Sequence, residues 1–248
     1  MNQVDVAVNA QAETVESNQI NVASPAEYEV DYREKKGYEI VKRAFDIVAS
    51  LCALTVLSPI FLITIIAIFL TDFGSPFFVQ DRVGKNGELF KIYKFRSMYK
   101  NAEQMRDSLL AQNEADGPTF KIAKDPRVTT VGRFIRKTSI DELPQLINIL
   151  KGDMSVIGPR PFIPKEQAKL SGVRLLVRPG LSCYWQIGGK NSLTVEELIA
   201  LDIKYIEERS LFVDFKIIRC RVATFDDANI IRSGVLVNTH FVDKLHKA

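Results

Sequence analysis

Residues 47–70 read IVASLCALTVLSPIFLITIIAIFL and contain no charged side chain over 24 positions. As an α-helix rising about 1.5 Å per residue, this segment is ~36 Å long, which exceeds the ~30 Å hydrocarbon core of a bilayer. A helix buried inside a soluble protein is seldom apolar over such a length. The segment therefore predicts a helix that enters a membrane.

The charges that flank this segment argue against a simple crossing. Basic side chains stand on both sides of it, namely Arg33, Lys35, Lys36, Lys42 and Arg43 before it, and Arg82, Lys85, Lys91, Lys94, Arg96 and Lys100 after it. Cationic flanks prefer the cytoplasmic face of a membrane, so both ends are expected on that face. Proline in a helix removes a backbone donor and kinks it, and Ser58-Pro59 lies at the middle of the segment. A re-entrant helix bent at Ser58 and Pro59 reconciles these features; a single kinked span remains the alternative.

Charge is distributed unevenly along the 248 residues. Residues 1–37 carry seven acidic and three basic side chains and few large apolar groups, which predicts a disordered acidic tail. The remaining 30 basic and 23 acidic side chains give residues 38–248 a net charge of +7, which suits anionic partners such as nucleotide diphosphates, lipid phosphates or nucleic acid. A nucleic-acid-binding motif is not recognisable, and the long apolar segment speaks against that class. The N-terminus does not have the pattern of a cleavable signal peptide.

The histidine and cysteine content excludes several kinds of catalytic site. The only histidines are His240 and His246, in the last nine residues. Ser-His-Asp chemistry, Cys-His chemistry and histidine-rich zinc sites are therefore not expected. Cys52, Cys183 and Cys220 form no CxxC pair, which fits a reduced cytosolic setting. Carboxylates, lysines and arginines must carry any reaction.

The rest of the chain predicts a mainly helical α+β fold. Residues 76–98 contain two aromatic and β-branched runs around Asn86-Gly87, a pattern typical of a β-hairpin. Helices are expected over residues 128–136, 194–208 and 212–232, the last of them amphipathic. The fold class is thus a re-entrant membrane helix hairpin, a small β-hairpin and amphipathic interfacial helices around a cytoplasmic catalytic domain.

One further helix is expected to begin near residues 141–142. Its apolar residues recur at i, i+3, i+4 and i+7, namely Leu143, Leu146, Ile147 and Leu150. Pro144 is tolerated only in a first turn, and Gly152 is a typical helix end. Asp141 and Glu142 therefore lie at a helix N-terminus. Asp141 could be a simple N-cap, and Ser139 with Glu142 has the spacing of a capping box.

Several short segments combine anion-binding side chains with residues that fix the backbone. They are Lys94–Met98 (KFRSM), Asp125–Arg127 (DPR), Arg133 with Arg136, Asp141–Gln145 (DELPQ) and Gly158–Pro161 (GPRP). Arginine binds phosphate oxygens bidentately and stays charged, and a helix N-terminus adds backbone N–H donors for the same anion. Each segment alone fits surface ion pairs equally well, whereas together they predict a preorganised phosphate site.

Taken in order, these motifs resemble the bacterial sugar transferase family, the monotopic polyprenyl-phosphate phosphoglycosyl transferases. The resemblance runs from about Lys42 to about Arg232 and corresponds to the small form that lacks an N-terminal membrane bundle. It rests on KRAFDIVAS, LSPIF, QDRVGKNGELFKIYKFRSM, DPRVTTVGRFIRKTSIDELPQLINILKGDMSVIGPRP, RPGLS and LDIKYIEERSLFVDFKII. It implies a helix kinked at Ser58-Pro59 with both ends in the cytoplasm of a bacterium, at the inner membrane.

The resemblance also implies the site. Asp141 is the expected nucleophile and Glu142 its partner, and the two are the expected ligands of Mg²⁺. The residues expected to act on substrate phosphate are Lys94, Arg96, Arg127, Arg136 and Arg160. A further functional carboxylate is expected near the C-terminus; Asp214 is preferred and is grouped with these phosphate-binding residues, and Asp202 is the alternative.

The implied reaction moves a sugar 1-phosphate from a UDP-sugar to polyprenyl (undecaprenyl) phosphate, with release of UMP through a covalent aspartyl intermediate. It would open the synthesis of an exopolysaccharide, capsule or other surface glycan. Two alternatives stay open: direct attack of the lipid phosphate without a covalent step, and a non-catalytic membrane adaptor for glycan-assembly partners.

The expected partners are the UDP-sugar, polyprenyl phosphate and membrane lipid, with a homodimer or downstream glycosyltransferases also open. The expected divisions are a tail over 1–37, the re-entrant helix over 38–73, the catalytic domain over 74–234 and a second tail over 235–248. The stretch Ser182–Gln186 departs from the family's T-G-x-x-Q pattern, and Lys190 stands where arginine is common. The sequence therefore leaves the sugar undetermined.

Overall fold

The structure, a computed structural model, describes residues 30–105, 108–109, 122, 125–187 and 194–223. The expected acidic tail up to residue 29 and the expected C-terminal tail over 235–248 lie outside these ranges, as do residues 224–232 of the last expected helix. Residues 30–35 already pack on the body, since Lys35 Nζ donates to the carbonyls of Glu207 (3.2 Å) and Arg209 (2.8 Å). Packing therefore starts before the expected boundary at residue 38.

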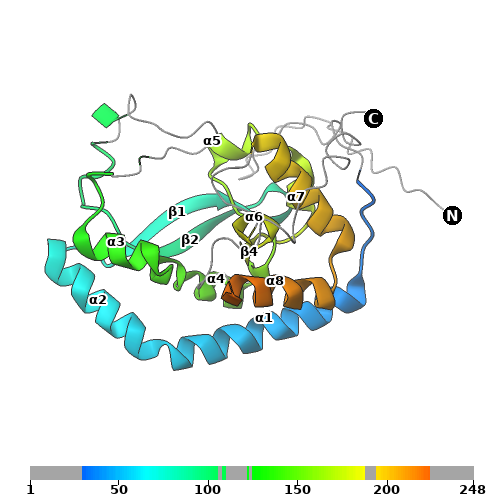
Figure 1. Cartoon of the computed structure of the whole chain (residues 1–248), viewed down its shortest axis with the longest axis horizontal. Coiled ribbons are helices and arrows are strands. Elements are labelled where there is room, and N and C mark those ends of the chain that lie inside the picture. The colour runs from blue at the N-terminus through cyan, green and yellow to red at the C-terminus, as the bar shows by residue number, and fades with distance from the viewer. Residues whose placement is uncertain (1–29, 106–107, 110–121, 123–124, 188–193, 224–248) are drawn as a thin grey trace.

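Two helices, α1 (Lys36–Val56) and α2 (Ser58–Asp72), form one bent arm beneath the rest of the molecule in Figure 1. The break falls at Leu57, and proline occupies the first turn of α2. The Ser58 hydroxyl donates to the Thr55 carbonyl at 2.8 Å, so it satisfies an acceptor at the end of α1. The helix therefore breaks next to Ser58 and Pro59, and the role of this break in a membrane stays a prediction.

The arm bends by 62°, which makes an open angle rather than a closed hairpin. Within the described part of the chain, a single helix with the length and apolarity of a membrane span does not occur, whereas α1 and α2 taken together have both.

The expected β-hairpin is present. Strands β1 (Phe77–Val83) and β2 (Leu89–Phe95) pair antiparallel, with Phe78 opposite Lys94. The connection is the 3₁₀ turn η2 (Lys85–Gly87), in which Asn86 and Gly87 have φ of 56° and 82°. Asparagine and glycine tolerate this left-handed backbone, which explains why the Asn-Gly signal predicted the turn.

The segment that carries Asp141 differs from its prediction. Helix α3 covers Thr130–Lys137, close to the expected range, but no continuous helix begins at residue 141. Instead, a 3₁₀ turn η4 (Ile140–Glu142) precedes a shorter helix α4 (Gln145–Lys151). The capping box was wrong, because Ser139 has a left-handed backbone (φ 57°) and its side chain caps nothing. Asp141 and Glu142, called the dyad below, therefore lie on a tight turn between two helices.

The C-terminal half surrounds the main hydrophobic core. Its elements are β3 (Ser155–Ile157), α5 (Pro164–Gln167), η5 (Gly172–Leu176), β4 (Gly180–Ser182), α6 (Tyr184–Ile187), α7 (Val195–Glu208) and α8 (Leu211–Ala223). Strands β3 and β4 pair in parallel, a contact between distant segments that local patterns did not predict. Helix α7 has a full capping box in which Thr194 and Glu197 bond reciprocally.

Three helices of the body lie on the arm (Figure 1). Helix α8 contacts α1 through a buried ion pair between Lys42 and Asp214 (2.7 Å) and an edge-on contact between Phe45 and Phe215. Arg43 of α1 donates to the carbonyls of Ile149 (2.5 Å) and Leu150 (2.7 Å) at the end of α4. The third, α3, contacts α2. The arm is therefore fixed to α3 and α4, the two helices on either side of the turn that carries Asp141 and Glu142.

The close approach of β3 and β4 gives a stability test. A Cβ at Gly180 would overlap the Gly158 backbone, which cannot give way cheaply. We expect Gly180→Ala to lower the free energy of unfolding by about 1–3 kcal/mol. The matched control is Gly37→Ala in α1, where a Cβ meets nothing within 4 Å and should be neutral or stabilising. Denaturant titration in detergent measures both, and equal effects would contradict the packing described.

Candidate active site

Asp141 and Glu142 lie on η4, which faces strand β2 and the Gly158–Pro161 segment. Lys94 Nζ of β2 is 3.2 Å from Glu142 Oε1, and Arg160 Nη1 is 3.8 Å from the same oxygen. The structure thus brings together side chains from three separate sequence motifs around one carboxylate. Hydrogen-bonded ion pairs of this kind fix both partners in place.

The remaining site cations surround Asp141 on the α3 side. Arg136 comes from the last turn of α3, where its Nε donates to the Ser97 hydroxyl at 2.7 Å. It acts electrostatically on Asp141, as Lys94 does. Arg127 lies one step further out, locked to Asp125 by a pair at 2.7 Å and close enough to Arg136 to influence it. Arg127 therefore acts on Arg136 rather than directly on Asp141 or Glu142.

Burial decides the electrostatics of Asp141. Loss of water raises its pKa to about 6, which Lys94 and Arg136 oppose and Glu142 reinforces. The neighbouring Glu142 behaves differently: burial pushes its pKa up, but Lys94 and Arg160 outweigh that and bring the pKa below the usual value. The two carboxylates are thus unequal, and both are ionised for the most part at neutral pH.

The cations of the site are crowded together. Burial lowers the pKa of Lys94, and repulsion from Arg160 and Arg82 adds to this, while Glu142 opposes it. Burial and Arg160 likewise lower the pKa of Arg82 to about 10, although Glu166 lies 3.8 Å from it. Like charges packed this closely favour an incoming anion, because it relieves their repulsion. Arg82 is a site residue that its motif, QDRVG, did not single out.

The backbone around Arg160 is unusually well fixed. Four successive carbonyls have donors: Pro159 from Gly180 N (2.9 Å), Arg160 from Arg174 Nη2 (2.9 Å), Pro161 from Arg82 Nη1 (3.3 Å) and Phe162 from Val83 N (3.0 Å). Two prolines restrict the same stretch further. Arg160 is therefore presented from a rigid segment.

Two predicted phosphate-binding residues are not brought to the dyad. Arg96 lies at the end of the arm, 3.8 Å from Asp72 of α2. Asp214 is buried between α1 and α8, where it binds Lys42 (2.7 Å) and accepts hydrogen bonds from Tyr38 (2.8 Å) and Tyr205 (3.0 Å). Its surroundings are those of an interhelical anchor.

The alternative carboxylate, Asp202, is also buried. It pairs with Arg174 at 2.7 Å, and Arg174 in turn donates to the Arg160 carbonyl. Asp202 thus reaches Arg160 only through Arg174. This connection joins segments that are distant in sequence, so local patterns do not predict it. Lys190 lies outside the described residues.

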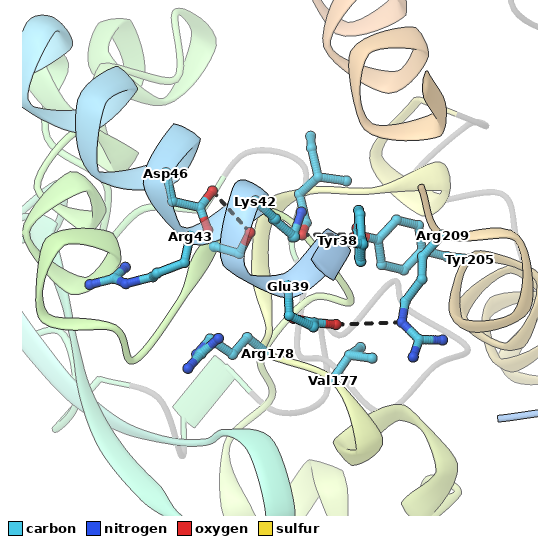
Figure 2. A pocket seen from close by; sticks show the side chains of 11 residues that line it. Tyr38, Glu39, Lys42, Arg43, Asp46, Val177, Arg178, Tyr205 and Arg209 are labelled. Atoms are coloured by element: carbon cyan, nitrogen blue, oxygen red, sulfur yellow. Dashed lines mark hydrogen bonds and ion pairs between the residues drawn. The ribbon is translucent and has the colours of Figure 1, made fainter. Parts of the chain in front are cut away.

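A small pocket lies elsewhere, between α1 and the body (Figure 2). Its lining includes Tyr38, Glu39, Arg43, Arg178 and Arg209, but neither residue of the dyad. The cations there are largely engaged, since Arg43 and Arg178 bind carbonyls at the end of α4 and Arg209 pairs with Glu39 at 3.6 Å. We assign it to the seam between arm and body, because the reactive groups lie at η4.

The donor set of the dyad fits Mg²⁺. Within the described residues, three or more metal-binding side chains do not cluster anywhere. Mg²⁺ does not need such a cluster, because it is usually held by one or two carboxylates, substrate phosphates and water. Asp141 and Glu142 supply two adjacent carboxylates beside cations suited to phosphate.

Comparison with known proteins gives one family. The profile described as bacterial sugar transferase matches residues 37–226. The chain is 45% identical over 193 residues to the galactosyl transferase CpsE of Streptococcus agalactiae, covering 74% of this chain and 42% of CpsE. It is 39% identical over 186 residues to the exopolysaccharide production protein ExoY of Rhizobium meliloti, covering 72% of this chain and 82% of ExoY.

A third relative is the undecaprenyl-phosphate galactose phosphotransferase of Salmonella typhimurium, 39% identical over 194 residues, which cover 74% of this chain and 40% of that protein. The chain therefore spans less than half of CpsE and of the Salmonella protein, but most of ExoY.

The surroundings of Asp214 predict how it responds to substitution. Asp214→Asn removes the carboxylate that pairs with buried Lys42 at 2.7 Å and leaves only the more distant Asp46 to act on that charge, so we expect a loss of about 3 kcal/mol in the free energy of unfolding. The double variant Lys42→Met with Asp214→Leu removes both charges and should recover most of that stability. Denaturant titration measures the three proteins. If Asp214→Asn folds as stably as the parent protein, the anchoring role is wrong.

Proposed function

The chain belongs to the bacterial sugar transferase family, and we propose that it transfers a sugar 1-phosphate from a UDP-sugar to polyprenyl phosphate, with release of UMP. Relatives named as undecaprenyl-phosphate galactose and glucose phosphotransferases support this reaction, and the two ExoY proteins support a role in exopolysaccharide synthesis. Because the chain covers only part of several relatives, the assignment of its own substrates is argued from the residues of the site.

One observation carries the proposal: two ionised carboxylates lie on a tight turn among cations that repel one another. Lys94, Arg136 and Arg160 outnumber Asp141 and Glu142. A nucleotide diphosphate would balance this excess of positive charge. Phosphoryl transfer depends mainly on positioning and on such charge stabilisation, so the arrangement suits it.

Asp141 is the better nucleophile of the two carboxylates. Glu142 is held by Lys94 at 3.2 Å and by Arg160 at 3.8 Å, whereas no other side chain in the described ranges forms a hydrogen bond or ion pair with Asp141. A carboxylate without a side-chain partner can attack phosphorus without first breaking an ion pair. With a pKa of about 6, Asp141 is largely ionised at pH 7 without help from a base.

The reaction then has two displacements. A carboxylate oxygen of Asp141 attacks the β-phosphorus of the donor, and the bond between that phosphorus and the bridging oxygen breaks, so UMP leaves with the electron pair. An oxygen of polyprenyl phosphate next attacks the same phosphorus. The acyl-phosphate bond breaks, Asp141 returns to its carboxylate form, and polyprenyl diphosphate sugar is released.

The other residues of the site bind the donor phosphates and neutralise their negative charge. Arg160 and Lys94 hold the donor phosphates, and Arg136 acts on the phosphate nearest to Asp141. Mg²⁺ held by Asp141 and Glu142 would neutralise charge on the diphosphate. Glu142 keeps Lys94 and Arg160 in place before the donor arrives, so that little reorganisation is needed at the transition state.

We also propose that the arm is a re-entrant membrane element with both ends on the cytoplasmic face. Its apolar side chains are exposed at many positions, including Val48, Leu51, Val56, Leu62, Ile63, Ile66 and Leu70. Phe134 of α3 and Phe212 and Phe215 of α8, helices that lie on the arm, are exposed as well. An apolar surface of this kind suits the lipid chain of the acceptor.

The covalent mechanism has a direct test. We expect Asp141→Asn to lower sugar-phosphate transfer by at least about a thousandfold, because the amide is a poor nucleophile. The parent protein, given Mg²⁺ and the correct UDP-sugar without acceptor, should release about one UMP per site and gain the mass of a sugar phosphate. Intact-protein mass spectrometry and a UMP assay over a panel of UDP-sugars measure both, and the panel identifies the sugar.

The control is Asp81→Asn, an exposed carboxylate 3.2 Å from Lys91 on the hairpin, which should react normally. Release of UMP only when lipid phosphate is present, with no mass gain, would favour direct attack by the acceptor. Full cellular function of Asp141→Asn would instead favour the membrane adaptor.

The re-entrant arrangement has a separate test. In a variant without Cys52, Cys183 and Cys220, cysteines placed at Lys36 and at Lys100 mark the two sides of the arm. Both should react with a membrane-impermeant maleimide from the cytoplasmic side only, because both flanks are basic. Labelling of the two positions from opposite sides would replace the re-entrant helix by a kinked span.

A further inference from the structure

Arg160 is less constrained at its charged end than Lys94, the other cation that pairs with Glu142. Its side chain is 31% exposed, compared with 17% for Lys94, and its ion pair with Glu142 is long, at 3.8 Å. A guanidinium that binds phosphate bidentately must have its plane correctly oriented, so something else has to restrict it.

The indole of Trp185 supplies that restriction. The guanidinium carbon of Arg160 lies 5.3 Å from the centre of the Trp185 ring, within the range of a cation–π contact. Trp185 belongs to the short helix α6, is half-buried, and packs against the main hydrophobic core. A ring held by the core is a rigid surface on which a planar guanidinium can lie.

The backbone of Arg160 is held from a second direction. Its carbonyl accepts from Arg174, whose own guanidinium pairs with Asp202 (2.7 Å) and lies over the ring of Phe162 (4.4 Å). Arg174 and Asp202 are almost completely buried, each with 3% of its side chain exposed. A buried pair of this kind is rarely an efficient source of stability, which favours a role in fixing geometry.

We propose that Trp185 is a positioning residue for Arg160: its ring holds the guanidinium in the plane that faces Glu142 and the donor phosphate, while the Arg174–Asp202 pair holds the backbone of Arg160. The inference rests on the proposed function, in which Arg160 binds donor phosphate. In this proposal, Asp202 orients Arg174, which in turn holds the carbonyl of Arg160. The proposal also assigns a role to Trp185, which lies in the stretch that departs from the family pattern.

A double-mutant cycle tests the coupling. Trp185→Leu should raise the KM for the UDP-sugar by about three- to thirtyfold, the range of a partly desolvated cation–π contact, and change kcat by less than about twofold. Trp185→Phe, which keeps an aromatic face, should recover part of the loss. Arg160→Lys keeps a positive charge but has no planar group to lie on the ring, so in that background Trp185→Leu should have almost no further effect on KM.

Tyr32→Leu is the matched control. Its ring lies 4.6 Å from the guanidinium of Arg209 and packs against the same core, but Arg209 has no contact with the dyad within the described residues. Tyr32→Leu should lose at least as much thermal stability as Trp185→Leu does. Its KM for the UDP-sugar should equal that of the parent protein. If Tyr32→Leu raises KM equally, the effect of Trp185 acts through the core and the proposal is overturned.

The second measurement needs no turnover. Trp185 is the single tryptophan of the chain, so all tryptophan fluorescence comes from this ring. Excited at the red edge of the indole band, this fluorescence should respond to UMP in the parent protein and in Asp81→Asn, the control on the hairpin. It should respond little in Arg160→Lys. An equal response in Arg160→Lys would overturn the proposal.

The outcomes separate the two proposals. Absence of UMP release with every UDP-sugar would defeat the proposed function before the cycle is measured. Normal release, together with fully additive effects of Trp185→Leu and Arg160→Lys, would leave the function intact and defeat the positioning role. An additive loss that depends on the identity of the sugar would instead assign Trp185 to direct sugar contact.

Discussion

The ion pair between Lys94 and Glu142 is the contact on which the site depends. It joins strand β2 to the turn η4, and each partner would be costly to bury alone, with side chains only 17% and 21% exposed. Once Glu142 is committed to Lys94 and Arg160, the adjacent Asp141 remains the carboxylate without a tight partner. The two neighbouring acids have pKa shifts in opposite directions because Glu142 forms direct ion pairs with Lys94 and Arg160, whereas Lys94 and Arg136 act on Asp141 without such a pair.

The geometry of this pair is maintained by elements far from it in sequence. Asn148 of α4 accepts from Tyr93 N (3.0 Å) and donates to the Lys91 carbonyl (2.7 Å), so the helix after the dyad is bonded directly to the strand that carries Lys94. At its other end, α4 is capped by Arg43 of the arm and by Arg178, which donates to the Gly152 carbonyl at 3.1 Å. Cations at a helix C-terminus satisfy its free carbonyls and complement its dipole. The arm and the strand therefore fix the same helix.

Sequence reasoning predicted the parts of this structure that depend on local chemistry. Asn86-Gly87 predicted the hairpin because few other residues adopt its backbone, and Ser58-Pro59 predicted the break because proline cannot continue a helix. Sequence reasoning failed where contacts between distant segments determine the backbone conformation or the neighbours of a residue. Ser139 adopts a left-handed backbone although its spacing to Glu142 fits a capping box, and the expected helix is replaced by a 3₁₀ turn and the shorter helix α4. The same limit applies to the site: Lys94, Asp141 and Arg160 came from motifs, but Arg82 and Arg174 enter through folding alone, since each donates to a carbonyl beside or at Arg160.

The connection between arm and dyad bears on how two unlike substrates reach one carboxylate. A nucleotide sugar arrives from water, whereas the phosphate of a polyprenyl lipid stays at the membrane surface. If α1 and α2 lie in the lipid as proposed, the distance of Asp141 from the surface is set by α1, because Arg43 fixes α4 two turns after the dyad. An open bend of 62° keeps the whole arm on one side of the body, so the apolar faces of α1 and α2 can be immersed without lifting η4 away from the headgroups. In the proposed mechanism, an arm that bends rather than extends across the bilayer brings the nucleotide-sugar donor and the lipid acceptor to the same carboxylate.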